Sequence, residues 1–343
     1  MHPVFGKALR WIGLAAATAA CATAARAQAQ TVADFYRGNT IRLHLSSEAG
    51  GGFDTIARIV AKYLAQYVPG RPNVIVVNMP GGGGTLMANW AYNIAPRDGS
   101  VVAMPLSTLP MNQIVAPDRI RYDANKFGWI GNLEQARGVI FTFHTSPTKS
   151  IQDARVRETP MAATGKNSII YQLLTLSNKL LGTRFKVVLG YNSGRVLAIE
   201  RGEVDGSAST LENIPALAPQ WAENPSLITL LAVNTERRLP KYPDVPTMIE
   251  LVKTPEQRQM LEFWALQSAT GRALFAPPGV PADRLDALRR AFDQLVRDQS
   301  FIADMARVQA AIDPNSGEEV QASVQRLLAT SPEVAAMILD AIK

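Results

Sequence analysis

Short apolar runs that alternate with amphipathic stretches constrain the fold of this chain more than any other feature. Residues 41–46 (IRLHLS) and 74–79 (VIVVNM) have the length and apolar character of buried strands. Between them, residues 54–67 place Ile56, Ile59, Val60, Tyr63 and Leu64 on one helical face. Nearly continuous apolar strands that alternate with helices are typical of a parallel sheet covered on both faces. Further apolar runs lie at residues 101–106, 138–143, 159–164, 185–191, 206–210 and 227–233. We therefore expect an α/β fold.

The length of 343 residues suggests two domains rather than one. The Pro-rich stretch at residues 237–248 (RRLPKYPDVPTM) predicts a long surface loop. Residues 276–292 predict a strand end, a turn and a helix that begins near Pro281.

The first 29 residues have the pattern of a secretory signal peptide. Lys7 and Arg10 precede an Ala-rich apolar run that ends near Ala25, and small residues offer a cleavage site near Ala27 or Ala29. The run is too short and too rich in alanine for a convincing membrane span. Two alternatives stay open, a retained N-terminal anchor helix and lipidation at Cys21. We expect an exported protein.

Removal of this segment changes the charge and the redox chemistry of the chain. The segment holds three basic residues and no acid, so the formal net charge falls from +6 to +3. The only cysteine leaves with it, so the mature chain has no thiol, disulfide or Cys-based metal site. Basic residues are interleaved with acidic ones and form no block, so we expect no nucleic-acid partner.

Two glycine-rich segments each follow a predicted strand and open a helix, SSEAGGGFD (46–54) and NMPGGGGT (78–85). In an open parallel sheet, ligands sit beyond the carboxyl ends of the strands, where free N–H groups and helix dipoles favour an anion. The two loops would then converge on one negative group. The alternative is that the glycines only make tight turns. Neither loop matches the P-loop or the dinucleotide fingerprint, so we expect no nucleotide cofactor.

Catalytic and metal-binding patterns are weak. Residues 146–149 (SPTK) match S-x-x-K, but the companion motifs are absent and the proline favours a surface turn. His44 lies in an apolar strand and His144 at a strand end, and neither has a metal-ligand partner at useful spacing. No nucleophile with its base is evident. We therefore predict a binding protein, not an enzyme, without a metal or cofactor.

Four segments, in this order, carry a resemblance to a known family. They are residues 49–70 (AGGGFDTIARIVAKYLAQYVPG), 74–100 (VIVVNMPGGGGTLMANWAYNIAPRDGS), 190–206 (GYNSGRVLAIERGEVDG) and 276–292 (APPGVPADRLDALRRAF). The chain resembles the Bug-type extracytoplasmic receptors of tripartite tricarboxylate transporters. The resemblance implies a type II periplasmic binding protein, with two doubly wound α/β domains around a hinge and a ligand cleft. It divides the mature chain into domain 1 (30–135 plus 236–343) and domain 2 (136–235).

The resemblance also implies where the ligand sits. In domain 1, backbone N–H groups and ordered water would grip a carboxylate; the residues there are Gly51, Gly52, Phe53, Asp54, Gly81, Gly82, Gly83, Gly84 and Thr85. In domain 2 the family pattern T-S-G-x-G-S corresponds to residues 163–168; the contributing residues are Thr164, Gly165, Asn167, which replaces a glycine, and Ser168. The Y-x-G-G turn brings Tyr191. From the residues themselves, the Ser107 hydroxyl ends the third strand, Asp205 either fixes a turn or faces the cleft, and Asp54 has helix capping as its alternative.

The function that follows is capture of a small organic carboxylate in the periplasm and delivery to a membrane permease, by a monomer. Two alternatives remain. The same fold can present its closed form to a membrane kinase as a sensor. An exported hydrolase acting on a carboxylate ester would need a serine, Ser107 or Ser168, within reach of a histidine. The sequence does not name the carboxylate.

Overall fold

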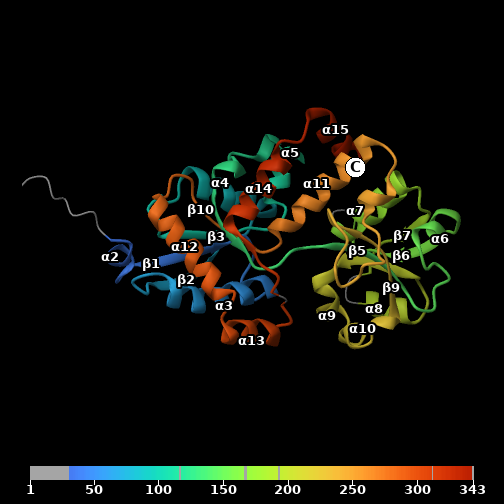
Figure 1. Ribbon diagram of the computed structural model, residues 1–343, viewed down its shortest axis with the longest axis horizontal. Helices are drawn as coiled ribbons and strands as arrows, with labels where there is room; N and C mark the ends of the chain where they lie inside the picture. Colours follow the sequence, from blue (N-terminus) through green and yellow to red (C-terminus); the bar gives the residue numbers. More distant parts are fainter. Residues whose placement is uncertain (1–30, 116, 166–167, 192–193, 311, 342–343) are drawn as a thin grey trace, which may run out of the picture.

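The structure is a computed structural model that describes residues 31–115, 117–165, 168–191, 194–310 and 312–341. These residues form two lobes that lie side by side along the longest axis of the molecule (Figure 1). Each lobe is built on one sheet. The strand order is β11-β4-β10-β3-β1-β2 in the first lobe and β7-β6-β8-β5-β9 in the second.

In the first sheet, the strands that precede the glycine-rich segments are parallel. β1 (Thr40–Leu45) pairs in parallel with β2 (Asn73–Asn78) and with β3 (Val101–Met104). β10 (Ala273–Ala276) is antiparallel to both β3 and β4 (Gly128–Asn132), and β4 also pairs with the short β11 (Asn315–Ser316). β4 therefore runs parallel to β3. The carboxyl ends of β1, β2, β3 and β4 meet at one edge of this sheet.

Helices cover both faces of the first sheet, and β1 contacts helices on both sides. Ile41, Leu43 and Leu45 enter the core that α3 (Gly52–Tyr67), α12 (Ala282–Leu295) and α13 (Gln299–Arg307) complete. On the other face, the ring of His44 lies 4.2 Å from that of Trp90 in α4 (Thr85–Asn93). α5 (Leu109–Val115) and α14 (Gly317–Leu328) lie on that side, and α2 (Val32–Tyr36) lies at the outer end (Figure 1).

The second sheet consists of β5 (Gly138–Phe143), β6 (Thr159–Ala162), β7 (Phe185–Val188), β8 (Gly206–Thr210) and β9 (Ile228–Asn234). β6 is parallel to β7 and β8, whereas β5 is antiparallel to β8 and β9. The helices of this lobe are α6 (Ile151–Val156), α7 (Ile169–Leu176), α8 (Arg195–Glu200), α9 (Ile214–Leu217) and α10 (Pro219–Glu223). α6 and α7 contribute to one core cluster, and α8, α9 and α10 to the cluster on the other side.

The remaining elements are short or lie at the boundary of the lobes. They are η1 (Gly82–Gly84), η2 (Pro117–Arg119), η3 (Ala124–Lys126), π-helical η4 (Ser177–Leu181), η5 (Leu211–Asn213), η6 (Pro225–Leu227), η7 (Met248–Leu251), α11 (Pro255–Leu266), η8 (Gln267–Thr270) and α15 (Pro332–Ala341).

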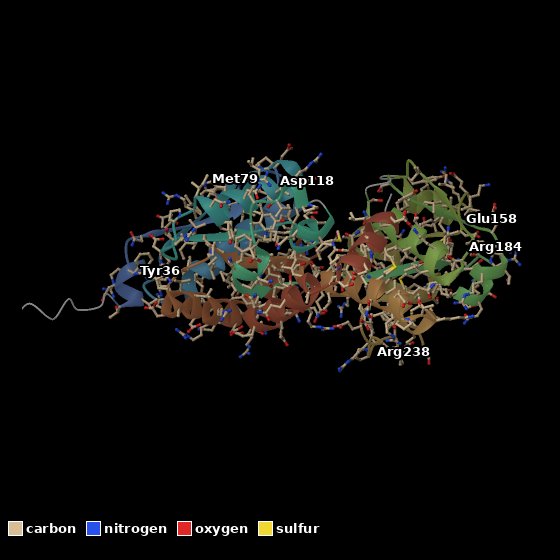
Figure 2. The ribbon with its side chains drawn as sticks, turned by 90° about the horizontal axis from the view of Figure 1, so that it is seen from above. Tyr36, Met79, Asp118, Glu158, Arg184 and Arg238 are labelled. Carbon is tan, nitrogen blue, oxygen red and sulfur yellow. The ribbon has the colours of Figure 1, made fainter. Side chains whose placement is uncertain are left out.

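The outgoing connection between the lobes sets how the two sheets face each other. β4 leaves the first sheet at Asn132, and β5 begins at Gly138, opposite Thr210 at the carboxyl end of β8. The carboxyl-end edges of both sheets therefore face the connection. Figure 2 agrees, because Tyr36 marks one outer end of the molecule, whereas Glu158 and Arg184, which precede β6 and β7, mark the other.

The returning chain lies directly against the outgoing one. The N–H of Leu133 donates to the carbonyl of Arg272 at 3.1 Å, and that of Ala136 to the carbonyl of Ser268 at 3.0 Å. A Cβ at Gly271 would lie only 2.3 Å from the carbonyl oxygen of Glu134, so this close approach requires glycine. Residues 133–137 and 268–272 thus form the paired connection between the lobes.

The chain stays with the second lobe for some distance after β9. Val233 forms a bridge with Thr247, and Met248 and Ile249 are buried in a core cluster of the second lobe. The stretch predicted as a long surface loop therefore ends in buried residues. The predicted helix near Pro281 begins, as expected, at Ala282.

Candidate functional site

The second glycine-rich segment forms a turn that only glycine adopts readily. Gly81, Gly82, Gly83 and Gly84 all have positive φ, at 136°, 57°, 64° and 90°. Side chains are disfavoured in this region, so the run of four glycines is a backbone requirement. The hydroxyl of Thr85 closes the turn by donating to the carbonyl of Gly82 at 2.7 Å. Here the chain passes from β2 into α4.

Both glycine-rich segments place the start of a helix at the carboxyl-end edge of the first sheet. The first turn of a helix leaves N–H groups without intrahelical partners. Gly51 is the N-cap of α3 and Gly84 the N-cap of α4, and neither glycine has a side chain that could satisfy those groups. In α4, the N–H of Thr85 already donates to the carbonyl of Gly82, so the N–H groups that follow it are the ones available to a ligand. A Cβ built on Gly51, Gly52 or Gly83 meets no atom within 4 Å, so these backbones face open space. The arrangement suits an anion.

The carboxylate of Asp54 is occupied in holding the loops. It is only 3% exposed and accepts hydrogen bonds from Gly50 N (3.0 Å), Arg58 Nε (2.9 Å) and Nη2 (3.1 Å), and Asn78 Nδ2 (3.0 Å). These bonds, with those from Arg58 first, lower the pKa of Asp54 to about 2. Asp54 lies within the predicted site, but its hydrogen bonds go to other protein groups and stabilise the first loop.

Ser46 was not among the predicted site residues. It follows β1, is 4% exposed, and its buried hydroxyl has no hydrogen-bond partner within the part of the chain that the structure describes. A Cβ on Gly84 would lie 3.4 Å from Ser46 Oγ, so the hydroxyl lies against the second glycine turn. The sequence signal that could have identified Ser46 is its position as the last residue of the apolar run at residues 41–46. Ser107, after β3, accepts a 2.9 Å hydrogen bond at its carbonyl from Thr270 of η8.

In the second lobe, the loops after β6 and β7 lie side by side at the facing edge. The N–H of Tyr191 donates to the carbonyl of Ala163 at 3.2 Å, and that of Gly190 to the carbonyl of Thr164 at 3.3 Å. Ser168 caps α7, since its hydroxyl accepts from Tyr171 N at 3.2 Å. The same hydroxyl donates to the carbonyl of Gly165 at 2.7 Å. Of the predicted residues in this lobe, Asn167 lies outside the described residues.

Arg195 is a second residue that the site prediction missed. It opens α8, directly beyond the loop that carries Tyr191, and it is 5% exposed. Burial lowers the pKa of its guanidinium.

The structure does not bring Asp205 to the other predicted residues. Asp205 precedes β8, so it lies at the amino end of that strand, whereas Thr164 and Tyr191 follow carboxyl ends. Its N–H donates to the carbonyl of Pro160, and its carbonyl accepts from Phe143 N, both at 2.8 Å. Burial raises the pKa of its carboxyl group. Its contacts are those of a turn at the outer edge.

A cavity of about 520 Å³ lies between the lobes beside the connection. Gly52 and Phe53 line it from the first lobe, and Thr210 and Glu212 from the second. Its charged groups are paired: Arg272 with Glu134, and Arg137 with Glu212 and Asp313. Burial raises the pKa of Glu212, and the nearby guanidinium of Arg137 opposes that rise. The cavity therefore lies where the two lobes meet, next to the connecting segments.

Among the described residues, neither Ser107 nor Ser168 forms a hydrogen bond with a histidine. No group of three or more His, Cys, Asp or Glu side chains that could hold a metal ion is found in the described ranges. Within the same ranges, no helix combines the length and apolar character that crossing a membrane requires.

Comparisons with known proteins agree on one family. Residues 56–331 match the family model described as "Tripartite tricarboxylate transporter family receptor". The "UPF0065 protein in gbd 5'region" of Cupriavidus necator is 34% identical over 249 residues, which cover 70% of this chain and 72% of that protein.

Solved structures support the fold. A TctC solute-binding protein from Polaromonas, without ligand, superimposes with a TM-score of 0.68 at 19% identity, over 90% of this chain and 99% of its own. MatC from Rhodopseudomonas palustris, with bound malate, gives a TM-score of 0.55 at 20% identity, over 89% and 99%. The predicted fold, with two α/β domains of the periplasmic-binding-protein type, is confirmed.

Proposed function

Because this chain belongs to the tripartite tricarboxylate transporter receptor family, we propose that it is a solute-binding receptor that captures a small organic carboxylate between its two lobes. One observation carries the proposal: α3 and α4 begin after the neighbouring strands β1 and β2, at the same edge of the first sheet, with glycine at both N-caps. The malate bound to MatC, a protein of similar fold, supports a carboxylate as the ligand class.

The physical argument concerns the cost of removing a carboxylate from water. Burial of an anion is expensive unless several donors replace its hydration. Charge-assisted hydrogen bonds from backbone N–H groups supply this replacement, and the dipoles of α3 and α4 add to it. Glycine lets the ligand approach the backbone closely at Gly51, Gly52 and Gly83, where an added Cβ would meet nothing within 4 Å.

Closure of the two lobes is the second part of the proposal. A ligand that contacts both lobes stabilises the closed form by the difference between its affinities for the two forms. The paired segments 133–137 and 268–272 are suited to act as the hinge, because the chain passes between the lobes through them and they are hydrogen-bonded to each other. The domain boundaries at residues 136 and 236 stay a prediction. The burial of Met248 with the second lobe supports a later return to the first.

Delivery to a membrane permease, a periplasmic location after cleavage near Ala27 or Ala29, and action as a monomer complete the proposal. Family membership supports the first two. A receptor that signals to a membrane kinase would use the same site, and the neighbouring genes would distinguish the two partners.

The test is thermal denaturation of the mature chain, refolded to remove any co-purified ligand, against a panel of small carboxylates. A ligand present at a hundred times its dissociation constant stabilises the folded state by about 2.7 kcal/mol. A shift with one acid, and no turnover of that acid, is the expected result. Turnover of the acid or of its ester would instead identify an enzyme.

A further inference from the structure

Arg195 is a buried cation that has no counter-charge among the residues that the structure describes. Its side chain lies on the buried face of α8 together with Ala198 and Ile199. Nε and Nη1 are buried and have no hydrogen-bond partner among the described residues. No described acidic side chain forms an ion pair with it, whereas Arg137, also partly buried, pairs with Glu212 and Asp313.

The position of Arg195 relates this unpaired charge to the gap between the lobes. Arg195 lies just beyond the carboxyl end of β7, and that edge of the second sheet faces the first lobe. Tyr191, from the same loop, is tied to Ala163 at the carboxyl end of β6. In the first lobe, the hydroxyl of Ser46 is likewise buried and without a partner within the described part of the chain. Unsatisfied polar groups thus occur at the facing edges of both lobes.

Such a group is costly in the free protein. A buried guanidinium stays protonated and loses its hydration without compensation. An acidic group of the ligand would supply the missing acceptors, and the planar guanidinium suits a carboxylate because it can donate two parallel hydrogen bonds.

We propose that Arg195 binds a second carboxylate of the ligand, so that this receptor selects dicarboxylates over monocarboxylates. The first carboxylate lies on the glycine loops of the first lobe, and the second pairs with Arg195 of the second lobe. This inference rests on the proposed function, since it assigns the far end of the same ligand. A monocarboxylate would close the lobes around an unpaired cation and bind about 10- to 100-fold more weakly.

The experiment compares three dicarboxylates, succinate, glutarate and adipate, with their monoamides, which keep the length and lose one charge. Dissociation constants are measured by calorimetry for the refolded wild type and for Arg195→Gln, Arg195→Met and Arg201→Gln. Arg201 caps the other end of α8 and is exposed, so Arg201→Gln is the matched control. The wild type and the control should prefer at least one dicarboxylate to its monoamide by about 10-fold or more. Arg195→Gln should lose that preference and keep the affinity for the monoamide.

The stability of the ligand-free protein is a second readout. Removal of an uncompensated charge should leave Arg195→Met at least as stable as the wild type in urea, whereas a structural role would make it less stable. If Arg195→Gln keeps the full preference for the dicarboxylate, the inference is wrong and the proposed function stands. If the wild type binds these acids no more tightly than their monoamides, the inference also fails. Failure of the wild type to bind any carboxylate would overturn the proposed function and this inference with it.

Discussion

Asn78 donates a 3.0 Å hydrogen bond through Nδ2 to Oδ1 of Asp54, and so joins the end of β2 to the first turn of α3. The same Nδ2 donates to the carbonyl of Ser47 at 3.0 Å. Asp54 also holds the N–H of Gly50. One carboxylate and one amide therefore fix the shape of the first loop relative to the strand that leads into the second. The two glycine loops are held as one unit before a ligand arrives.

Asp54→Asn should weaken ligand binding through this unit. The substitution removes the charge that accepts from Arg58 and Gly50, and we expect a loss of about 1–3 kcal/mol of stability and about tenfold in carboxylate affinity. Asp153→Asn is the matched control, because Asp153 also accepts from a backbone N–H, that of Lys149, near the start of a helix. The control should lose stability alone, as measured by urea unfolding and calorimetry. Equal affinity loss in both variants would contradict the role of Asp54 as a brace of the site.

Gly83→Val should abolish ligand binding without abolishing the fold. Gly83 has φ of 64° and Gly202 has φ of 74°, and a Cβ on either meets no atom within 4 Å. Valine at either position therefore carries the same conformational cost, about 1–2 kcal/mol. Only Gly83 lies on the loop at the facing edge, whereas Gly202 lies near the amino end of β8. Titration of both variants with the identified carboxylate tests this, and retained affinity in Gly83→Val would remove the loop from the site.

The strands and the glycine loops could be predicted from the sequence because their signals are local. The apolar run at residues 74–79 and the four glycines after it specify a strand and a turn that only glycine tolerates, wherever the rest of the chain goes. The expectation that this strand is buried was wrong, because β2 lies at the edge of its sheet and Ile75 is 40% exposed. The start of α12 at Ala282 follows Pro281 for the same reason.

What the sequence could not supply depends on contacts between distant segments. The sequence RGEVDG (201–206) allows Asp205 to face the cleft. The direction of β8 instead places Asp205 at the edge of the second sheet that lies away from the first lobe. Arg195 and Ser46 stand out because burial leaves them without hydrogen-bond partners among the described residues, and for Arg195 no local pattern encodes this. The burial of Met248 likewise depends on the bridge between Thr247 and Val233.

His44 should make the stability of the protein depend on pH between about 4 and 6.5. The ring is 4% exposed, and burial, with a smaller effect of the Arg42 charge, lowers its pKa from 6.5 to about 4. In this pH range the imidazole of His44 is protonated in the unfolded chain and neutral in the folded chain. The free energy of unfolding therefore falls as the pH falls through this window. The shift corresponds to about 3 kcal/mol. His44→Phe keeps an aromatic ring against Trp90 and should flatten this part of the curve. Urea unfolding of the variant and the wild type at pH 7 gives the difference between them when His44 is neutral in both states. If the free energy of unfolding of the variant falls with pH below 6.5 as steeply as that of the wild type, His44 is not responsible.

Arg137→Met should destabilise the connection between the lobes. Glu212 is buried, and Arg137 pairs with it and also donates its own N–H to Glu212 Oε2 at 3.0 Å. Loss of the guanidinium leaves Glu212 without its cation, which costs about 3–5 kcal/mol when an ion is fully buried. Arg238→Met is the control, since the pair that Arg238 forms with Glu250 is exposed and should contribute about 0–1 kcal/mol. Urea unfolding of both variants measures the difference. Adding Glu212→Gln to Arg137→Met should restore part of the stability, because a neutral amide no longer needs a counter-charge. Equal losses from the two arginines would mean that water reaches Glu212 and that the connection does not depend on this pair.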